Sequence, residues 1–327
     1  MIILNADEIR TALPMETAIA AMKQAYAALS SGHTETPLRS HLAIAPHKGT
    51  CLFMPAYVNA ETEALAVKIV SLFPENPSRD LPLIHAAVLV LEADSGRTLA
   101  LLEGGALTAI RTGAASGAAT DLLARPTART AAIFGAGRQA RTQLEAICCV
   151  RKIETAWIFD LDRQKAQDLV AEMAGQGKIP RDLRVAGDPA EAASQAEIIC
   201  TATTSKDPVY PAEAIQPGTH LNGVGSYTPE MIENPPEIYN RASAFVDSRA
   251  AALAEAGETI AAINRKYLFP NELAELGEVF LGQQPGRTSA EQITFFKSVG
   301  IAVQDAFAAH LAIQNASAES LGQRVVW

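Results

Sequence analysis

A glycine-rich turn carries the strongest chemical signal in this sequence. Residues 131–134 form an apolar run with the length of a buried parallel strand, and Gly135-Ala-Gly137-Arg-Gln-Ala140 follows it directly. The spacing fits the Gly-x-Gly-x-x-Gly/Ala fingerprint, in which Gly135 would allow a tight turn, Gly137 the approach of a pyrophosphate, and Ala140 close helix packing. The next helix would offer free N–H groups and a positive dipole end to the phosphates. The stretch therefore predicts a dinucleotide site.

An acid ends the next strand-like run, residues 155–159. Asp160 lies where a Rossmann domain keeps the carboxylate that binds a ribose hydroxyl, which favours NAD(H). Arg163 follows three residues later and could accept the 2′-phosphate of NADP(H), so both cofactors remain open. Strand, glycine turn, helix, strand and acid in this order predict a nicotinamide or flavin site. The alternative is a Rossmann-like sheet without a cofactor.

Two cationic side chains stand in apolar or small-residue surroundings. Lys68 interrupts the strand-like run 64–73, where it either extends to a sheet edge or is held near the chemistry with a lowered pKa. Arg111 is the only charged residue between Glu103 and Asp121, in a predicted helix of small residues. A lone arginine there needs an anion, which could be a protein carboxylate or a substrate.

Two regions of different class must position these groups. Residues 7–30 have helical periodicity, interrupted by Pro14, and the strands that follow complete an α+β layer. These strands are predicted at residues 49–54 (ending at Pro55), 64–73, 85–91 and 98–102.

From residue 130 to 248, strands and helices alternate as in a doubly wound parallel sheet. The six predicted strands are residues 131–134, 156–159, 183–186, 197–201, 220–224 and 244–246. Thr201 and Thr203 would lie at the carboxyl edge of the fourth strand, and Val224 and Gly225 at that of the fifth, facing the cofactor. Helices are predicted at 273–281 and 301–316, on either side of a strand and turn at 293–300. The last helix could return to the first domain.

Composition excludes several classes of function. The chain has 327 residues, 48% of them hydrophobic, which favours two globular domains. Its net charge of -9 argues against nucleic acid as a partner. The start lacks the basic region of a signal peptide, and no apolar run reaches the roughly 18 residues of a membrane span, so we expect a cytoplasmic protein. The cysteines and histidines show no metal-ligand spacing, so we expect no metal.

Several stretches, taken together and in order, resemble one enzyme family. They are Phe53-Met-Pro-Ala-Tyr57, Val67-Lys-Ile-Val-Ser71, Leu107-Thr-Ala-Ile-Arg-Thr112, Phe134-Gly-Ala-Gly-Arg-Gln-Ala-Arg-Thr-Gln143, and Phe296-Lys-Ser-Val-Gly300 with Gln304-Asp305. On these residues the chain resembles the ornithine cyclodeaminase/μ-crystallin family over nearly its whole length. The resemblance implies enzymes that use NAD(P)(H) on the imine of an amine and an α-keto acid. It also implies dimers or larger assemblies, joined through the first domain.

The resemblance assigns roles to individual residues. By motif position, Lys68 looks like the catalytic lysine, and Arg39 and Arg111 look like the arginines that bind the substrate carboxylate. Two such arginines could hold an α-carboxylate and lower the pKa of Lys68, making it a proton donor or acceptor near neutral pH. Asp305 could be a partner of the helix dipole or support the site from behind. The predicted cofactor-binding residues are Gly135, Ala136, Gly137, Arg138, Gln139, Asp160, Arg163, Thr201, Thr203, Val224, Gly225, Ser298 and Gly300.

The predicted fold class is α/β, a Rossmann doubly wound parallel sheet plus an α+β domain. With the resemblance, residues 1–120 become a substrate-binding and dimerisation domain, to which 300–327 return. Residues 121–299 become the NAD(P)-binding Rossmann domain. The predicted partners are a small imino or amino acid and a second copy of the chain, with neither nucleic acid nor a membrane.

One departure from the family pattern selects among its activities. Cyclodeaminases of the family carry an aspartate after the fifth Rossmann strand, which engages the ornithine amine, whereas this chain reads Gly225-Ser226-Tyr227-Thr228-Pro229. We therefore expect a reductase of cyclic ketimine acids, which converts pyrroline-2-carboxylate or piperideine-2-carboxylate to proline or pipecolate. The alternative is an ornithine cyclodeaminase or alanine-type amino-acid dehydrogenase. A third hypothesis is a non-catalytic, μ-crystallin-like binding protein, against which the retention of Lys68, Arg111 and Asp160 argues.

Overall fold

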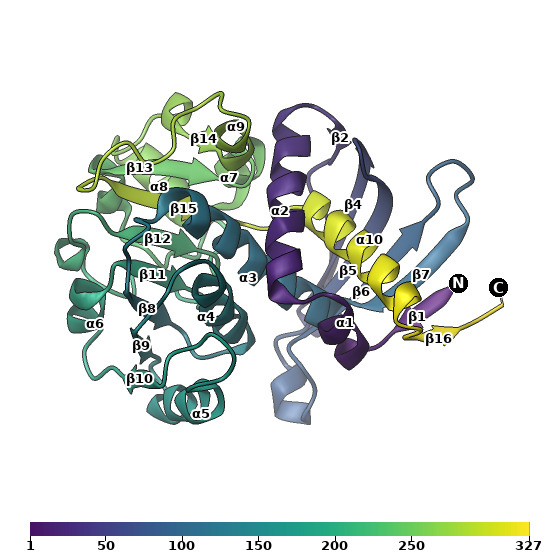
Figure 1. The fold of residues 1–327 in the computed structure, drawn as a ribbon, viewed down its shortest axis with the longest axis horizontal. Helices are drawn as coiled ribbons and strands as arrows, with labels where there is room; N and C mark the ends of the chain where they lie inside the picture. The colour runs from purple at the N-terminus through teal and green to yellow at the C-terminus, as the bar shows by residue number, and fades with distance from the viewer. Residues whose placement is uncertain (327) are drawn as a thin grey trace. The chain divides into compact units, whose positions relative to one another are not determined.

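The computed structural model describes residues 1–326 as two compact units (Figure 1). The first unit comprises Met1–Arg111 and the chain from Ile301 onward, and the second comprises Thr112–Gly300. The division falls within helix α3, Gly104–Leu123, which continues from one unit into the other. It therefore lies earlier than the expected boundary after residue 120.

The first unit contains an eight-stranded, mainly antiparallel sheet in the order β16-β1-β7-β6-β5-β4-β2, with β3 also paired to β4. Its strands are β1 Ile2–Leu4, β2 Thr34–Glu35, β3 Ser40–Ile44, β4 Gly49–Asn59, β5 Glu63–Leu72, β6 Ile84–Leu91, β7 Thr98–Glu103 and β16 Gln323–Arg324. The prediction that the strand at 49–54 ends at Pro55 is wrong, because β4 continues through this proline. At Pro55 the ladder has a partner on one side only, Val67 of β5, so a residue without an N–H is tolerated.

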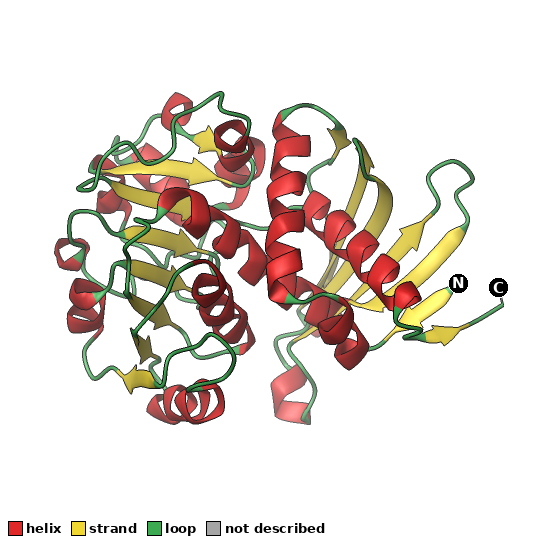
Figure 2. Ribbon diagram, in the orientation of Figure 1, coloured by secondary structure: helices red, strands yellow, loops and turns green. Residues whose placement is uncertain are grey.

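Three α-helices of the described residues lie wholly within this unit: α1 Ala6–Ala12, α2 Met15–Ser30 and α10 Ala302–Ala318. Asn5 begins α1 by accepting hydrogen bonds from two backbone N–H groups of its first turn, and Pro14 separates α1 from α2, as predicted. Helix α10 lies beside α2 and packs on β4, β5 and β6 (Figures 1 and 2). Its many alanines allow this close approach to the sheet.

Apolar side chains also occupy the opposite face of the sheet. Neighbours across strands share a face, so Val67 lies beside Pro55 and Leu89, and Ile69 lies beside Phe53. Ile69 is 38% exposed and the other four are half-buried. This face is therefore more accessible than the one covered by α10.

The second unit is built on a parallel sheet of eight strands in the order β10-β9-β8-β11-β12-β15-β13-β14. The strands are β8 Thr130–Phe134, β9 Thr155–Phe159, β10 Asp182–Val185, β11 Ile198–Thr201, β12 His220–Gly223, β13 Ala242–Val246, β14 Ala274–Glu275 and β15 Ile293–Lys297. The predicted Rossmann-type α/β sheet is confirmed. One difference is that β15 lies between β12 and β13, consistent with its five residues all being buried.

The α-helices of this unit are α4 Arg138–Val150, α5 Arg163–Met173, α6 Pro189–Gln195, α7 Arg249–Glu255, α8 Gly257–Asn264 and α9 Leu276–Phe280. Short 3-10 helices lie at Ala45–His47, Asn76–Arg79, Ala212–Ala214, Pro236–Asn240 and Pro270–Glu272. The helix predicted at 273–281 is wrong in its start, because α9 begins only after Glu275, whose N–H donates to the Glu278 carboxylate at 2.8 Å. Within residues 1–326, no helix is both long and apolar enough to cross a membrane.

The strand order of the second sheet reverses between β8 and β11. From β8 the sheet extends through β9 to β10, and from β11 it extends through β12 to β15. In open α/β sheets, ligands bind at the carboxyl ends of the strands beside such a reversal. We therefore expect a cofactor to bind at the loops that follow β8 and β11.

Candidate active site

Lys68 is a buried lysine on β5 whose ammonium faces the start of α10. Its side chain is 2% exposed, and it shares the inner face of the sheet with Met54 and Val88. Its Nζ lies 2.7 Å from Oδ2 of Asp305, which is 1% exposed. The lysine therefore does not extend to an edge of the sheet, but forms a buried ion pair.

Arg111 joins the same carboxylate from α3. Its Nε lies 3.1 Å from Oδ1 of Asp305, and its Nη1 donates to Oε1 of Gln304 at 2.8 Å. Gln304 in turn donates from Nε2 to the hydroxyl of Tyr26 at 2.6 Å. We call Lys68, Arg111, Asp305, Gln304 and Tyr26 the lysine–aspartate cluster. Two of the three predicted catalytic residues thus meet at one aspartate.

The charge balance of this cluster suits an anionic ligand. Burial is the main cause that lowers the pKa of Lys68 to about 7, Arg111 and Arg39 lower it further, and Asp305 opposes them. The third predicted catalytic residue, Arg39, therefore lies close enough to act on Lys68; it is half-buried and precedes β3. Two buried cations, Lys68 and Arg111, share the single carboxylate of Asp305, so a substrate carboxylate would be attracted here. Lys68 can also bind or release a proton near neutral pH.

The roles of Asp305 and Gln304 as direct partners of Arg111 and Lys68 were missed by sequence reasoning. Both are almost fully buried in α10, a helix made largely of alanine and other apolar residues. Two adjacent polar residues in such an apolar helix were the signal that could have indicated a buried polar site. Tyr26 gave no signal, because it fits the apolar periodicity of α2 as a core residue.

The glycine turn of the second unit faces open space at Gly137. Gly135 has φ +92°, and a Cβ there would lie 2.7 Å from the carbonyl oxygen of Ala202, so only glycine fits. At Gly137, within the described residues, a Cβ would meet no heavy atom within 4 Å, and this residue begins α4 without a side chain to cap it. The predicted residues Arg138 and Gln139 form the first turn of α4. The open N-terminus of α4 is the arrangement that binds a pyrophosphate.

Asp160 lies at the end of β9 and contacts the glycine turn. Its Oδ2 accepts the N–H of Ala136 at 2.7 Å, and its Oδ1 accepts the N–H of Asp162 at 2.8 Å. Arg163 is exposed at the start of α5, which Asp162 caps. A carboxylate beside the turn, at this end of β9, fits a ribose hydroxyl.

The other predicted cofactor residues lie at the same edge of the sheet. Thr201 ends β11 and is buried, and Thr203 follows it. Val224 and Gly225 follow β12, and two further predicted residues, Ser298 and Gly300, follow β15. All thirteen predicted residues therefore belong to the carboxyl ends of β8, β9, β11, β12 and β15 or to the helix starts after them.

Buried acids that sequence reasoning missed hold these loops. Asp247 follows β13, and its Oδ2 accepts the Ser298 hydroxyl at 2.7 Å and the N–H groups of Val299 and Gly300 at 2.9 and 2.8 Å. Glu233 accepts the N–H groups of the loops after β11 and β12. An acid directly after a strand was the signal for Asp247. Glu233 lies in a loop with no readable pattern.

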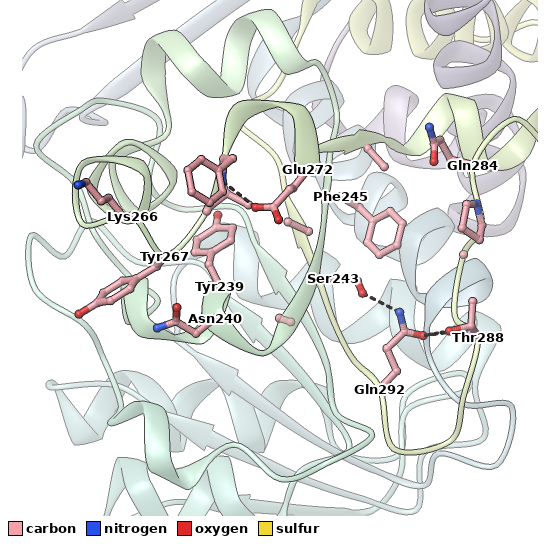
Figure 3. A pocket seen from close by; sticks show the side chains of 17 residues that line it. Tyr239, Asn240, Ser243, Phe245, Lys266, Tyr267, Glu272, Gln284, Thr288 and Gln292 are labelled. Atoms are coloured by element: carbon pink, nitrogen blue, oxygen red, sulfur yellow. Dashed lines mark hydrogen bonds between the residues drawn. The ribbon is translucent and has the colours of Figure 1, made fainter.

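A cavity of about 660 Å³ lies in another part of the second unit (Figure 3). It follows β13 from Ala242 to Phe245 and is bordered by the segment that contains Gln292, which donates to the Ser243 hydroxyl at 2.7 Å. None of the predicted site residues in the described part of the chain lines it. The cavity therefore shares no lining residue with the glycine turn or the lysine–aspartate cluster.

Comparison with known proteins shows the family of this chain. The sequence model of the ornithine cyclodeaminase/mu-crystallin family matches residues 1–320. The chain is 37% identical over 327 residues to a Delta(1)-pyrroline-2-carboxylate reductase of Bacillus cereus, covering 99% of both proteins.

Solved structures give the same result. The Delta(1)-pyrroline-2-carboxylate reductase of Thermococcus litoralis, in complex with NADH and L-proline, superposes with a TM-score of 0.94 at 37% identity, covering 99% of this chain and 100% of that one. An archaeal alanine dehydrogenase dimer with bound NAD has a TM-score of 0.92 at 30% identity, covering 100% and 99%. The chain belongs to the ornithine cyclodeaminase/mu-crystallin family.

Proposed function

We propose that this protein is an NADH-dependent reductase of cyclic ketimine acids, acting on pyrroline-2-carboxylate to form proline. The observation that carries the proposal is the buried pairing of Lys68 and Arg111 on Asp305. Support comes from the 37% identity over the full chain to the Bacillus cereus reductase and from the fold shared with the Thermococcus litoralis enzyme, which binds NADH and L-proline.

Arg111 and Arg39 would bind the carboxylate of the substrate. A planar guanidinium can donate two parallel hydrogen bonds to a carboxylate, which fixes both the position and the rotation of the neighbouring carbon. Arg111 is itself held by Asp305 and Gln304, so its orientation is set before substrate binds. Such preorganisation lowers the entropy cost of orienting the reacting carbon.

Lys68 would supply the proton of the reaction. When bound, NADH supplies the hydride that adds to the imine carbon. The C=N double bond becomes a single bond, and the Lys68 ammonium donates a proton to the nitrogen. With its pKa lowered to about 7, Lys68 can donate this proton and recover one from solvent near neutral pH.

The second unit would bind the cofactor, with NADH preferred. The Gly137 turn and the start of α4 would bind the pyrophosphate, and Asp160 would accept a ribose hydroxyl. Asp160 holds a carboxylate beside the glycine turn, and this charge would repel a 2′-phosphate bound next to it, which disfavours NADPH. The exposed Arg163 is the only predicted residue that favours NADPH.

The loop after β12 argues against ornithine as the substrate. It contains Ser226 and Tyr227 where a dicationic substrate calls for a carboxylate, and the Ser226 hydroxyl is already bonded to Glu258. A small ring without a second amine fits this loop better. An alanine-type dehydrogenase is the second candidate, because the archaeal relative combines 30% identity with a TM-score of 0.92.

We propose further that two copies of the chain assemble through the open sheet face of the first unit. This face bears the partly exposed apolar residues Phe53, Pro55, Val67, Ile69 and Leu89, and the archaeal relative is a dimer. A cytoplasmic location, with access to NADH, belongs to the same proposal. Light scattering after size-exclusion chromatography should give twice the chain mass, and Val67→Glu should give the monomer mass.

The decisive experiment follows NADH and NADPH oxidation with pyrroline-2-carboxylate and piperideine-2-carboxylate. Wild type is compared with Lys68→Ala and Arg111→Ala, whose folding is checked by circular dichroism. We expect rapid oxidation of NADH that both variants lose. Oxidation of NADH with pyruvate and ammonia, but with neither cyclic imine, would support the alanine-type dehydrogenase instead.

A further inference from the structure

A second buried charged group lies in the second unit, behind the loops after β11 and β12. It consists of Glu233, Glu258 and Lys297, each at most 1% exposed. Two carboxylates and one ammonium buried together are costly unless each makes several hydrogen bonds. We call these three residues the carboxylate–lysine cluster. The proposed chemistry uses none of them.

Glu233 connects two loops through their backbone. Its Oε1 accepts the N–H of Thr203 at 2.5 Å, while its Oε2 accepts those of Gly225 and Ser226 at 2.6 and 2.9 Å. Thr203 follows β11, and the other two follow β12. A single carboxylate therefore holds the ends of two neighbouring strands at a fixed separation.

The other members of the cluster hold Ser226 at its remaining polar atoms. Nζ of Lys297 donates to the Ser226 carbonyl at 2.6 Å and to that of Gly223 at 3.3 Å. The Ser226 hydroxyl donates to Glu258, whose other oxygen lies 3.3 Å from Nζ of Lys297. Ser226 is thus held at its N–H, carbonyl and hydroxyl by three buried charged groups.

The packing leaves no room for another arrangement. A Cβ on Gly225 would lie 2.2 Å from the carbonyl oxygen of Thr203 and 2.4 Å from Oε1 of Glu233. Only glycine allows the two loops to approach this closely.

We propose that Glu233 is a positioning residue that presets the loops after β11 and β12 for the nicotinamide half of NADH. The inference rests on the proposed function. Asp160, which follows β9, marks the adenosine side of the strand reversal, so the nicotinamide half extends toward β11 and β12. Charge-assisted hydrogen bonds to Glu233 order both loops before the cofactor arrives, so binding does not bear the entropy cost of ordering them.

The test compares Glu233→Gln with Glu230→Gln, a matched change at an exposed residue of the same loop. Glutamine keeps one acceptor oxygen, but its NH₂ group would point at the backbone N–H groups of one of the two loops. At least one loop therefore loses its hydrogen bonds to residue 233. We expect the Kd for NADH, from fluorescence titration, and its KM to rise about tenfold or more, as for the loss of a charge-assisted bond. The KM for pyrroline-2-carboxylate can rise as well, because the loop after β12 also faces the proposed substrate.

General loss of stability would lower the fraction of folded protein, but it would not raise the Kd of the folded protein for NADH. Equal NADH constants in Glu233→Gln and Glu230→Gln would overturn the inference. If the wild type neither binds nor oxidises NADH, the proposed function is wrong. That outcome differs from equal NADH constants in the two variants, which contradicts only the role of Glu233.

Amide hydrogen exchange of the cofactor-free wild type tests the same point without a variant. The N–H groups of Thr203, Gly225 and Ser226 should already be protected, and added NADH should change them little. Rapid exchange that slows only with NADH would mean that the cofactor orders these loops, contrary to the proposal. This measurement decides the matter even if Glu233→Gln does not fold.

Discussion

The ammonium of Lys68 lies 2.7 Å from one oxygen of Asp305, and the guanidinium of Arg111 lies 3.1 Å from the other. One buried carboxylate therefore balances two buried cations. Burial, Arg111 and Arg39 lower the pKa of Lys68, and Asp305 raises it. Asp305 thus favours the protonated form of the proposed donor, against burial and the two arginines.

The first prediction concerns the pH dependence of the reaction. Only the ammonium form of Lys68 can donate a proton, so kcat/KM for imine reduction should fall as the pH rises above about 7. Asp305→Asn removes the charge that raises this pKa, so the falling limb should move to lower pH. Initial rates of NADH oxidation between pH 5.5 and pH 9, in steps of about half a unit, would measure both profiles. A limb that stays in place in Asp305→Asn would exclude Lys68 as the donor.

The same pKa predicts how stability changes with pH. The pKa of Lys68 is about 7 in the folded chain and its ordinary value is 10.5, so above pH 7 the unfolded chain binds more protons than the folded one. Stability should therefore rise with pH between about 7 and 10, by up to about 1.4 kcal/mol per pH unit from this group. The difference in unfolding free energy between wild type and Lys68→Met, from urea titrations, isolates the contribution. A difference independent of pH would show that Lys68 keeps an ordinary pKa.

Much of the fold was predictable because its signals are local. The apolar runs of the second unit, the glycine turn at Gly135 and the acid at Asp160 are readable from type and spacing alone. The position of β15 was not, because strand order depends on which buried runs pack together across long stretches of chain. The continuation of β4 through Pro55 was not predictable either, because it depends on where β2 and β3 stop pairing with β4.

The candidate site was predictable only in part, for a related reason. Lys68 and Arg111 stand out because a charge in an apolar segment is costly and calls for a partner. The partner itself, Asp305, lies 194 residues from Arg111 in the sequence, and no local pattern connects the two. Glu233 is harder still, because its role consists of accepting backbone N–H groups, which leave no mark on the sequence of the loops they belong to.

Cofactor preference gives a third prediction. Asp160→Ala should raise the KM for NADH about tenfold, because the ribose loses a charged acceptor. The ratio of kcat/KM for NADH to kcat/KM for NADPH should therefore fall. Asp168→Asn, an exposed change on α5, is the control. The ratio of kcat/KM values for the two reduced cofactors is the measurement. An unchanged ratio in Asp160→Ala would leave Arg163 or the backbone as the source of any preference.

The fourth prediction concerns the two glycines of the turn, Gly135 and Gly137. Substitution of the first should mainly lower stability, and substitution of the second should mainly weaken NADH binding. Gly135→Ala places a Cβ 2.7 Å from the Ala202 carbonyl oxygen at a φ of +92°, so it should destabilise the fold by about 1–3 kcal/mol. Gly137→Ala has φ -79° and open space around its Cβ, so unfolding should change by less than about 1 kcal/mol.

Binding should respond differently in the two variants. The methyl group of Gly137→Ala would occupy the space assigned to the pyrophosphate, so NADH affinity should fall about tenfold or more while the melting temperature stays close to wild type. Thermal melting and fluorescence titration on the same preparations make the comparison. Normal NADH affinity in Gly137→Ala would place the pyrophosphate away from this turn, because no ligand bound against Gly137 could accommodate the added methyl group.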